Sequence, residues 1–203
     1  MKNIKLPVVL LLSFLSLSCG HSLNNSGESL NVPIHTIQAN TENSLYQLGG
    51  TWTDQDGKPV KLEKLSGKVQ VVAMMFTTCG YACPKIVHNM KEIEQQLPAK
   101  ARKKTRFLLI SFDAKTDTPE RLKQYADQKM LGDSWTLLHG SPDEIRSMSM
   151  VLGVQYAPLQ GGGFNHSNVI TILDENGNIY KQIDGLDISI HQAVKEIETA
   201  TQS

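Results

Sequence analysis

Nearly continuous apolar runs alternate along this chain with stretches whose apolar residues recur every three or four positions. Residues 69–76 and 106–112 form two such runs, typical of strands buried on both faces of a sheet. Residues 135–139 are predicted as a third, shorter strand. The stretches between these runs have the period of amphipathic helices, so the pattern predicts strands alternating with helices.

Prolines mark the predicted starts and ends of the helices. A helix is predicted from Pro84 to Pro98, because proline suits the first turn of a helix and ends a helix when it follows one. Its apolar face recurs at helical spacing: Ile86, Met90, Ile93 and Leu97. Two further helices are predicted to begin at Pro119 and Pro142, and a last one covers residues 188–199.

Two hairpins frame this alternation. Residues 51–62 hold a D-Q-D-G turn between two strand-like pieces, and residues 168–173 and 178–183 flank the turn D-E-N-G. The predicted order is therefore hairpin, β-α-β-α-β-α, then β-β-α. Strands that alternate with helices favour a parallel sheet covered on both faces, and the closing hairpin makes that sheet mixed. We predict a thioredoxin-like α/β fold with an N-terminal β-hairpin.

Composition narrows the function. The 203 residues suffice for one domain, and 20 basic residues balance 20 acidic ones to a net charge of zero. This balance argues against nucleic-acid binding, and no DNA-binding motif is present. Three cysteines are too few for a disulfide-stapled scaffold.

The N-terminus has the pattern of an export signal. Lys2 and Lys5 precede an apolar run of 12 residues, which is shorter than the roughly 20 needed to span a bilayer. Residues 1–18 are predicted as a lipoprotein-type signal peptide, because Cys19 stands where a bacterial lipobox places the cysteine that becomes lipidated. Ser16 occupies the position where the strict lipobox has Leu, and ordinary cleavage near Cys19 is the alternative.

A polar segment follows Cys19. Residues 19–44 are rich in Ser, Asn and Gly without an apolar period, which predicts a flexible tether in which His21 and His35 are solvated. Residues 45–203 form the predicted domain. We expect the protein to lie in a bacterial cell envelope, facing the periplasm and anchored to the membrane by lipid.

Two cysteines carry the candidate chemistry. Cys79 and Cys83 follow the first buried strand and lie at the start of the next helix, where four-residue spacing puts both side chains on one face. The positive end of a helix favours thiolates, and a strand-end loop predicts an exposed position. The pair can close a Cys79–Cys83 disulfide or bind a soft metal ion. A structural disulfide or two buried thiols remain the plain alternatives.

Three motifs in register carry a family resemblance. The sequence F-T-T-C-G-Y-A-C-P at 76–84 is followed by S-F-D-A-K-T-D-T-P-E at 111–120 and by His166-Ser167 ahead of the strand at 168–173. Together they resemble the Sco/SenC family, the copper-binding assembly proteins of cytochrome c oxidase. Ala114 stands where the family usually has Pro, and Asn165 where many members have Asp. The glycine-rich residues 160–164 suggest a mobile loop before the histidine.

The resemblance implies a function and a ligand set. Copper, as Cu(I) or Cu(II), would be bound by Cys79, Cys83 and His166 in a metallochaperone that serves the copper-bearing subunit of cytochrome c oxidase. Two sulfurs and one imidazole suit this ion, and they also fit zinc. Because an oxidising envelope tends to close the Cys79–Cys83 disulfide, an external thiol reductant is a further expected partner.

A second function remains open from the same residues. An envelope thiol:disulfide oxidoreductase would use Cys79 as the attacking thiolate and Cys83 as the resolving thiol, so whether the protein is an enzyme is undecided. Such an enzyme has no need of His166, which favours the copper site. Peroxidase action is disfavoured because the T-x-x-C spacing is absent.

The remaining candidate ligands receive structural interpretations. His88 falls off the apolar face of its helix and is predicted to face solvent, while His139 and His191 have no evident partner. Met74 and Met75 lie in a buried run and are predicted to fill the core rather than to bind copper.

Overall fold

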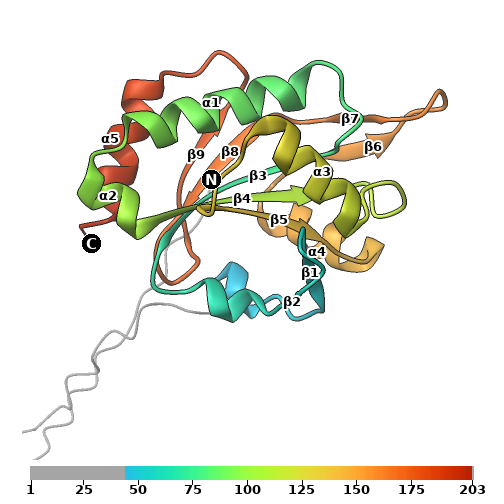
Figure 1. Cartoon of the computed structure of the whole chain (residues 1–203), viewed down its shortest axis with the longest axis horizontal. Helices are drawn as coiled ribbons and strands as arrows, with labels where there is room; N and C mark the ends of the chain where they lie inside the picture. The colour runs from blue at the N-terminus through green and yellow to red at the C-terminus, as the bar shows by residue number, and fades with distance from the viewer. Residues whose placement is uncertain (1–43, 203) are drawn as a thin grey trace, which may run out of the picture. The chain divides into compact units, whose positions relative to one another are not determined.

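A seven-stranded mixed sheet organises residues 44–202, the part of the chain that the computed structural model describes (Figure 1). Its strand order is β2-β1-β5-β4-β3-β8-β9. The strands are β1 (Trp52–Asp54), β2 (Pro59–Val60), β3 (Val69–Met75), β4 (Thr105–Ser111), β5 (Trp135–His139), β8 (Val169–Leu173) and β9 (Ile179–Asp184). Strands β3, β4 and β5 run parallel, whereas every other pairing in this sheet is antiparallel.

Helices cover both faces of this sheet. They are α1 (Ala82–Gln96), α2 (Ala99–Lys104), α3 (Pro119–Lys129), α4 (Pro142–Val151) and α5 (Ile190–Ala200). Helices α1, α3 and α5 lie above the sheet in Figure 1 and α4 lies below it. The thioredoxin-like mixed α/β fold with its N-terminal hairpin is confirmed.

The core follows the predicted apolar runs. Every residue of β3 and β8 is buried, which explains why neither run alternates with polar positions. Met74 and Met75 are buried in β3 and fill the core as predicted. The predicted apolar face of α1 is also buried along its whole length.

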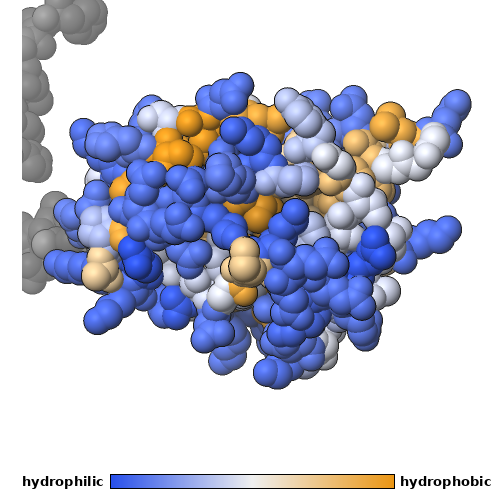
Figure 2. Space-filling view, turned by 45° about the horizontal axis from the view of Figure 1, so that its top comes forward, coloured by the Kyte–Doolittle hydropathy of each residue, from blue (hydrophilic) through white to orange (hydrophobic). Residues whose placement is uncertain are grey.

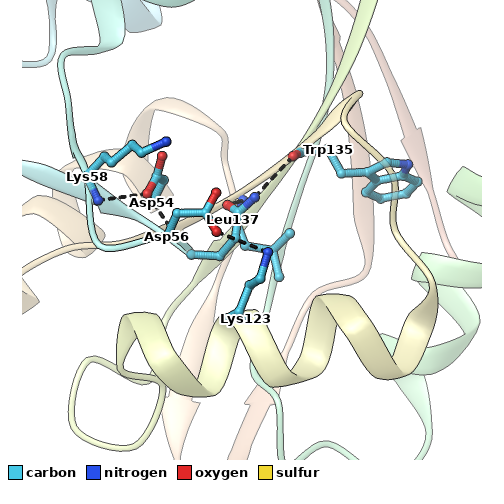
Figure 3. Close-up of polar contacts among 7 residues, drawn as sticks. Asp54, Asp56, Lys58, Lys123, Trp135 and Leu137 are labelled. Carbon is cyan, nitrogen blue, oxygen red and sulfur yellow. Dashed lines mark hydrogen bonds and ion pairs between the residues drawn. The ribbon is translucent and has the colours of Figure 1, made fainter.

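Side chains of the N-terminal hairpin, β1 and β2, contact strand β5 and helix α3 (Figure 3). The side chain of Gln55 donates to Trp135 O at 3.4 Å and accepts from Leu137 N at 2.9 Å, so it extends the pairing of β1 with β5. Lys123 of α3 forms an ion pair with Asp56 at 3.0 Å, but both side chains are about half exposed, so the pair adds little stability. The hairpin is therefore held mainly by hydrogen bonds to the backbone of β5.

The structure contains an α-helix and a small second sheet that the sequence pattern did not predict. The chain continues past Pro98 into α2, whose Ala-Lys-Ala-Arg-Lys-Lys sequence has high helix propensity. Arg102 of this helix donates to Leu97 O at 2.7 Å, which satisfies a carbonyl that α1 leaves open at its end. A separate two-stranded sheet, β6 (Tyr156–Pro158) and β7 (Phe164–His166), forms between α4 and β8.

Several predictions on the N-terminal segment lie outside the described residues. These are the signal peptide at 1–18, lipidation at Cys19 and most of the tether. Ser44, the last residue of the predicted tether, is buried and its hydroxyl donates to Asn176 O. No helix within residues 44–202 has the length and apolar character to cross a membrane.

Substitution of Gly140 tests how the N-terminal hairpin packs on the sheet. A Cβ added at Gly140 would lie 2.6 Å from the ring of the buried Trp52, so Gly140→Ala forces the ring or the backbone to move. We expect a loss of about 1–3 kcal/mol in the free energy of unfolding, measured by denaturant titration. Gly132→Ala, where a Cβ meets open space, is the matched control. Equal stability of the two variants would contradict this packing.

Candidate metal centre

The two cysteines lie at the junction of β3 and α1. Cys79 belongs to the turn after β3, where its N–H donates to Phe76 O at 3.2 Å. Cys83 lies in the first turn of α1, which begins at Ala82 and so two residues earlier than predicted. The N–H of Cys83 donates to the sulfur of Cys79 at 3.3 Å. The cap residue Tyr81 makes no side-chain bond to the helix, so the Cys79 sulfur supplies the acceptor at this helix start.

His166 lies close to the cysteines in space, although it follows Cys83 by 83 residues in the sequence. It lies at the end of β7, and its Nε2 is 3.7 Å from the sulfur of Cys83. Its Nδ1 is 3.0 Å from the carbonyl of Ser167, and a carbonyl can only accept, so Nδ1 carries the proton. In the neutral form of the ring, the lone pair of Nε2 then faces the cysteines. This is the tautomer that a metal ligand requires.

The three predicted ligands form one cluster. The sulfurs of Cys79 and Cys83 and a ring nitrogen of His166 all lie within 4.8 Å of one another, and both cysteines are free thiols. A metal ion that binds two sulfurs at about 2.3 Å and one nitrogen at about 2.0 Å fits between atoms at such separations. The structure thus brings together the residues that the motifs indicated.

A group of aromatic rings supports the histidine. The ring of Tyr156 stacks on Phe112 at 5.3 Å between centroids, and Phe164 packs edge-on against Phe76 at 5.3 Å. His166 itself lies 5.1 Å from Phe112 and 5.9 Å from Phe76. These contacts fix the β6–β7 hairpin, and with it His166, against the end of the sheet.

The two thiols differ in acidity. Partial burial raises the pKa of Cys79, but hydrogen bonds from the backbone N–H groups of Cys83, Tyr81 and Ala82 outweigh it, so the pKa lies below its ordinary value. Burial raises the pKa of Cys83 well above its ordinary value, and the negative charge of Cys79 adds to this. The expectation that the helix start favours both thiolates therefore holds for Cys79 alone.

An open pocket of about 720 Å³ gives access to Cys79 and His166. Its rim includes Tyr81 and Leu159, whose side chains are 80% and 53% exposed. Of the described residues that line it, none is Asp, Glu, Lys or Arg. The surface in Figure 2 is mostly hydrophilic; its largest apolar area lies at the upper left, and a smaller apolar spot lies at the upper right. The centre is thus approached through uncharged, partly apolar surface.

Two sequence predictions about the ligands need correction. Cys83 was expected on an exposed loop, yet it is 0% exposed because α1 begins early and packs it against the core. His166 was expected in a loop. It is instead the last residue of strand β7, where it is paired with Tyr156 of β6. The glycine-rich residues 160–163 lie in the connection of this hairpin.

The other histidines have the following places. His88 is exposed on α1 as predicted, and His191 is exposed on α5. His139, for which no partner was evident, places Nδ1 3.0 Å from the backbone carbonyl of Asp117. None of the three belongs to the ligand cluster of the described residues. Asp117 and the ring of Tyr156 are contacts that the sequence reasoning missed.

The family is decided by comparison with known proteins. A family model described as SCO1/SenC matches residues 38–202. The chain belongs to the SCO1/SenC family.

Individual relatives of this family member agree. A protein of Stutzerimonas stutzeri named for copper binding is 28% identical over 130 residues, which are 62% of this chain and 63% of that protein. The match thus spans less than two thirds of that relative. The crystal structure of a SCO1/SenC family lipoprotein from Bacillus anthracis covers 74% of this chain and 91% of its own, at 28% identity and a TM-score of 0.67. Copper-bound ScoI of Arabidopsis thaliana has the same fold, with a TM-score of 0.64 and 24% identity over 75% of this chain and 99% of its own.

The unequal acidity of the thiols predicts unequal reactivity. Because the thiolate is the nucleophile, we expect iodoacetamide to modify Cys79 well before Cys83 between pH 6 and pH 8 in the reduced, metal-free protein. Peptide mass spectrometry resolves the two sites over time. Equal rates, or faster modification of Cys83, would contradict the acidity assigned to them.

Proposed function

We propose that this protein is a copper-binding metallochaperone that carries copper on Cys79, Cys83 and His166. The observation that carries the proposal is the cluster of two sulfurs and one imidazole nitrogen within 4.8 Å. Copper is named in the description of the S. stutzeri relative and is bound in the A. thaliana structure, which supports this choice of ion.

The donor set suits copper in both oxidation states. Two sulfur ligands match the softness of Cu(I), and the imidazole adds a donor suited to Cu(II). Cys83 remains a thiol at neutral pH because burial raises its pKa, so metal binding must release its proton. Three protein ligands leave one side of the ion free, and a carrier that must hand over its cargo needs such an open side.

We infer that the cargo is delivered to the binuclear copper site of cytochrome c oxidase. The pocket opens beside Tyr81 and Leu159, so a partner could approach the metal without meeting a charged rim. Copper is then the cargo of the protein, transferred by ligand exchange.

We propose that lipid at Cys19 anchors the protein in the envelope. Within the described domain, Leu45 N donates to Gly177 O at 2.9 Å, in the turn between β8 and β9. That turn lies at the end of the sheet where β3 begins, whereas Cys79 follows the opposite end of β3. Seven residues of strand span about 23 Å. Leu45 therefore lies at the end of the sheet opposite the metal centre.

Thiol:disulfide exchange is a second candidate function. The observation that favours it is the difference between an accessible Cys79 of lowered pKa and a buried Cys83 of raised pKa, as an attacking and a resolving thiol require. The orientation of His166 supports copper, because its Nε2 can supply a third donor beside the two sulfurs, although in thiol exchange the same nitrogen could accept the proton of Cys83. An external thiol reductant serves both functions, since copper binding needs the reduced pair.

Substitution of the ligands tests the copper site. We expect Cys79→Ser and Cys83→Ser to abolish tight copper binding, because each removes a soft, charged donor. His166→Ala should weaken Cu(II) far more than Cu(I), because two sulfurs alone can hold Cu(I) in nearly linear geometry. Titration of the reduced protein against a competing chelator measures both affinities.

The controls for this titration lie in the same chain. His88→Ala removes an exposed histidine on α1 and should bind copper as the wild type does. Stoichiometric copper in the double Cys79→Ser, Cys83→Ser variant would exclude the site. Zinc that stays bound during an equimolar Cu(I) challenge would instead indicate a zinc protein.

Oxidase assembly in cells tests the delivery. In a host that depends on this protein, Cys79→Ser should lower the copper content of the oxidase, measured on the purified oxidase. Cys19→Ala, exported as a soluble chain, should retain the site but load the oxidase less well, because an anchor raises the effective concentration near the partner. Normal loading by Cys79→Ser would contradict the delivery role.

A further inference from the structure

Asp117 is a carboxylate with 0% exposure that the ligand set leaves out. It lies between β4 and α3, directly before Thr118, the cap residue of α3. Its oxygens accept hydrogen bonds from the N–H of Thr77 at 2.9 Å, from the hydroxyl of Thr77, and from the hydroxyl of Ser111 at 2.6 Å. Two of the donors belong to Thr77, two residues beyond the end of β3, and the third belongs to Ser111, the last residue of β4.

Burying this group has a cost. Within residues 44–202 the structure pairs Asp117 with no cationic side chain in an ion pair. A buried carboxylate without such a partner costs several kcal/mol unless hydrogen bonds compensate. Three donors compensate here, and the nearby cation acts indirectly, because Nε of Arg121 donates to the Thr77 hydroxyl at 3.0 Å.

The carboxylate of Asp117 accepts hydrogen bonds at the point where the backbone pairing of β3 with β4 ends. Strand β3 pairs with β4 as far as Met75 and Ser111, and Phe112 N donates to Met75 O at 3.0 Å. Beyond this point no strand supplies a carbonyl for the N–H of Thr77. The carboxylate of Asp117 accepts this hydrogen bond instead. Two residues later comes Cys79. The chain therefore leaves the sheet toward the ligands in a direction that Asp117 fixes.

The side chain of Asp117 does not serve α3. The hydroxyl of Thr118 accepts from Arg121 N and caps that helix, and the backbone N–H of Asp117 donates to Asp113 O at 2.9 Å. Removal of the carboxylate would thus leave the helix start intact and release Thr77. Its contacts point to the cysteine turn and not to helix stability.

We propose that Asp117 is a positioning residue of the metal centre, which acts through Thr77 to hold the turn that carries Cys79 in reach of Cys83 and His166. The inference rests on the proposed copper site and extends it to a residue that does not touch the ion. Partners that orient metal ligands typically contribute 10-fold to 100-fold to metal affinity.

The test uses the reduced full chain. We expect Asp117→Asn to bind Cu(I) about 10-fold to 100-fold more weakly in a chelator competition. Thr77→Val should weaken binding in the same direction. The double variant should lose less than the two single losses combined, because both act on one contact. Thr105→Val is the matched control, since it removes a buried hydroxyl bond of 2.9 Å at the opposite end of β4 and should keep wild-type affinity.

Hydrogen exchange separates positioning from charge and from copper binding. In the metal-free protein, residues 77–83 should exchange faster in Asp117→Asn than in the wild type and in Thr105→Val. Unchanged exchange or unchanged affinity in Asp117→Asn overturns the proposal, as does an equal loss in Thr105→Val. If the wild type binds no copper, the proposed function fails and the exchange data alone decide whether Asp117 holds the turn. If Asp117→Asn does not fold, Thr77→Val carries both measurements with the same criteria.

Discussion

The antiparallel pairing of β3 with β8 is the constraint on which the metal centre depends. Ala73 is paired with Ile170, so the chain that leaves β3 and the chain that enters β8 meet at one end of the sheet. Cys79 follows the first strand and His166 precedes the second. Every residue of both strands is buried, so a slip in register would force the core on both faces of the sheet to repack, and the core itself fixes the register. Hydrophobic burial in two strands thereby sets the distance between Cys83 and His166, which are 83 residues apart in the sequence.

Around this pairing, the structure holds each ligand by a different interaction. Cys83 is held by packing in the first turn of α1, and the carboxylate of Asp117 fastens the turn of Cys79 through Thr77. Aromatic contacts hold the hairpin of His166. Removing one support should therefore loosen one ligand and leave the others in place. A site built in this way can keep its geometry without a bound ion, as the proposed carrier role would require.

Much of the fold could be predicted from the sequence because burial leaves a plain pattern. The continuous apolar runs at β3 and β4 and the helical period of the apolar face of α1 are long enough to be recognised. Helix α2 was missed because Pro98 ends one helix and begins another, and a six-residue helix has too few apolar positions to show a period. The β6–β7 hairpin was missed because its strands have three residues each, and its stability comes from rings on distant elements.

The sequence predicts the ligands of the site but not the burial and acidity of its two thiols. Spacing and motif order indicate Cys79, Cys83 and His166, but the same spacing is compatible with two exposed thiols or with one buried thiol. The early start of α1 decides between them, and it depends on the Cys79 sulfur accepting the N–H of Cys83. The pKa of Cys79 is thereby lowered, whereas that of the buried Cys83 is raised, so Cys83 gives up its proton only to a strong competitor. A metal ion is such a competitor, so the fold that buries Cys83 makes the complete ligand set form when the metal arrives.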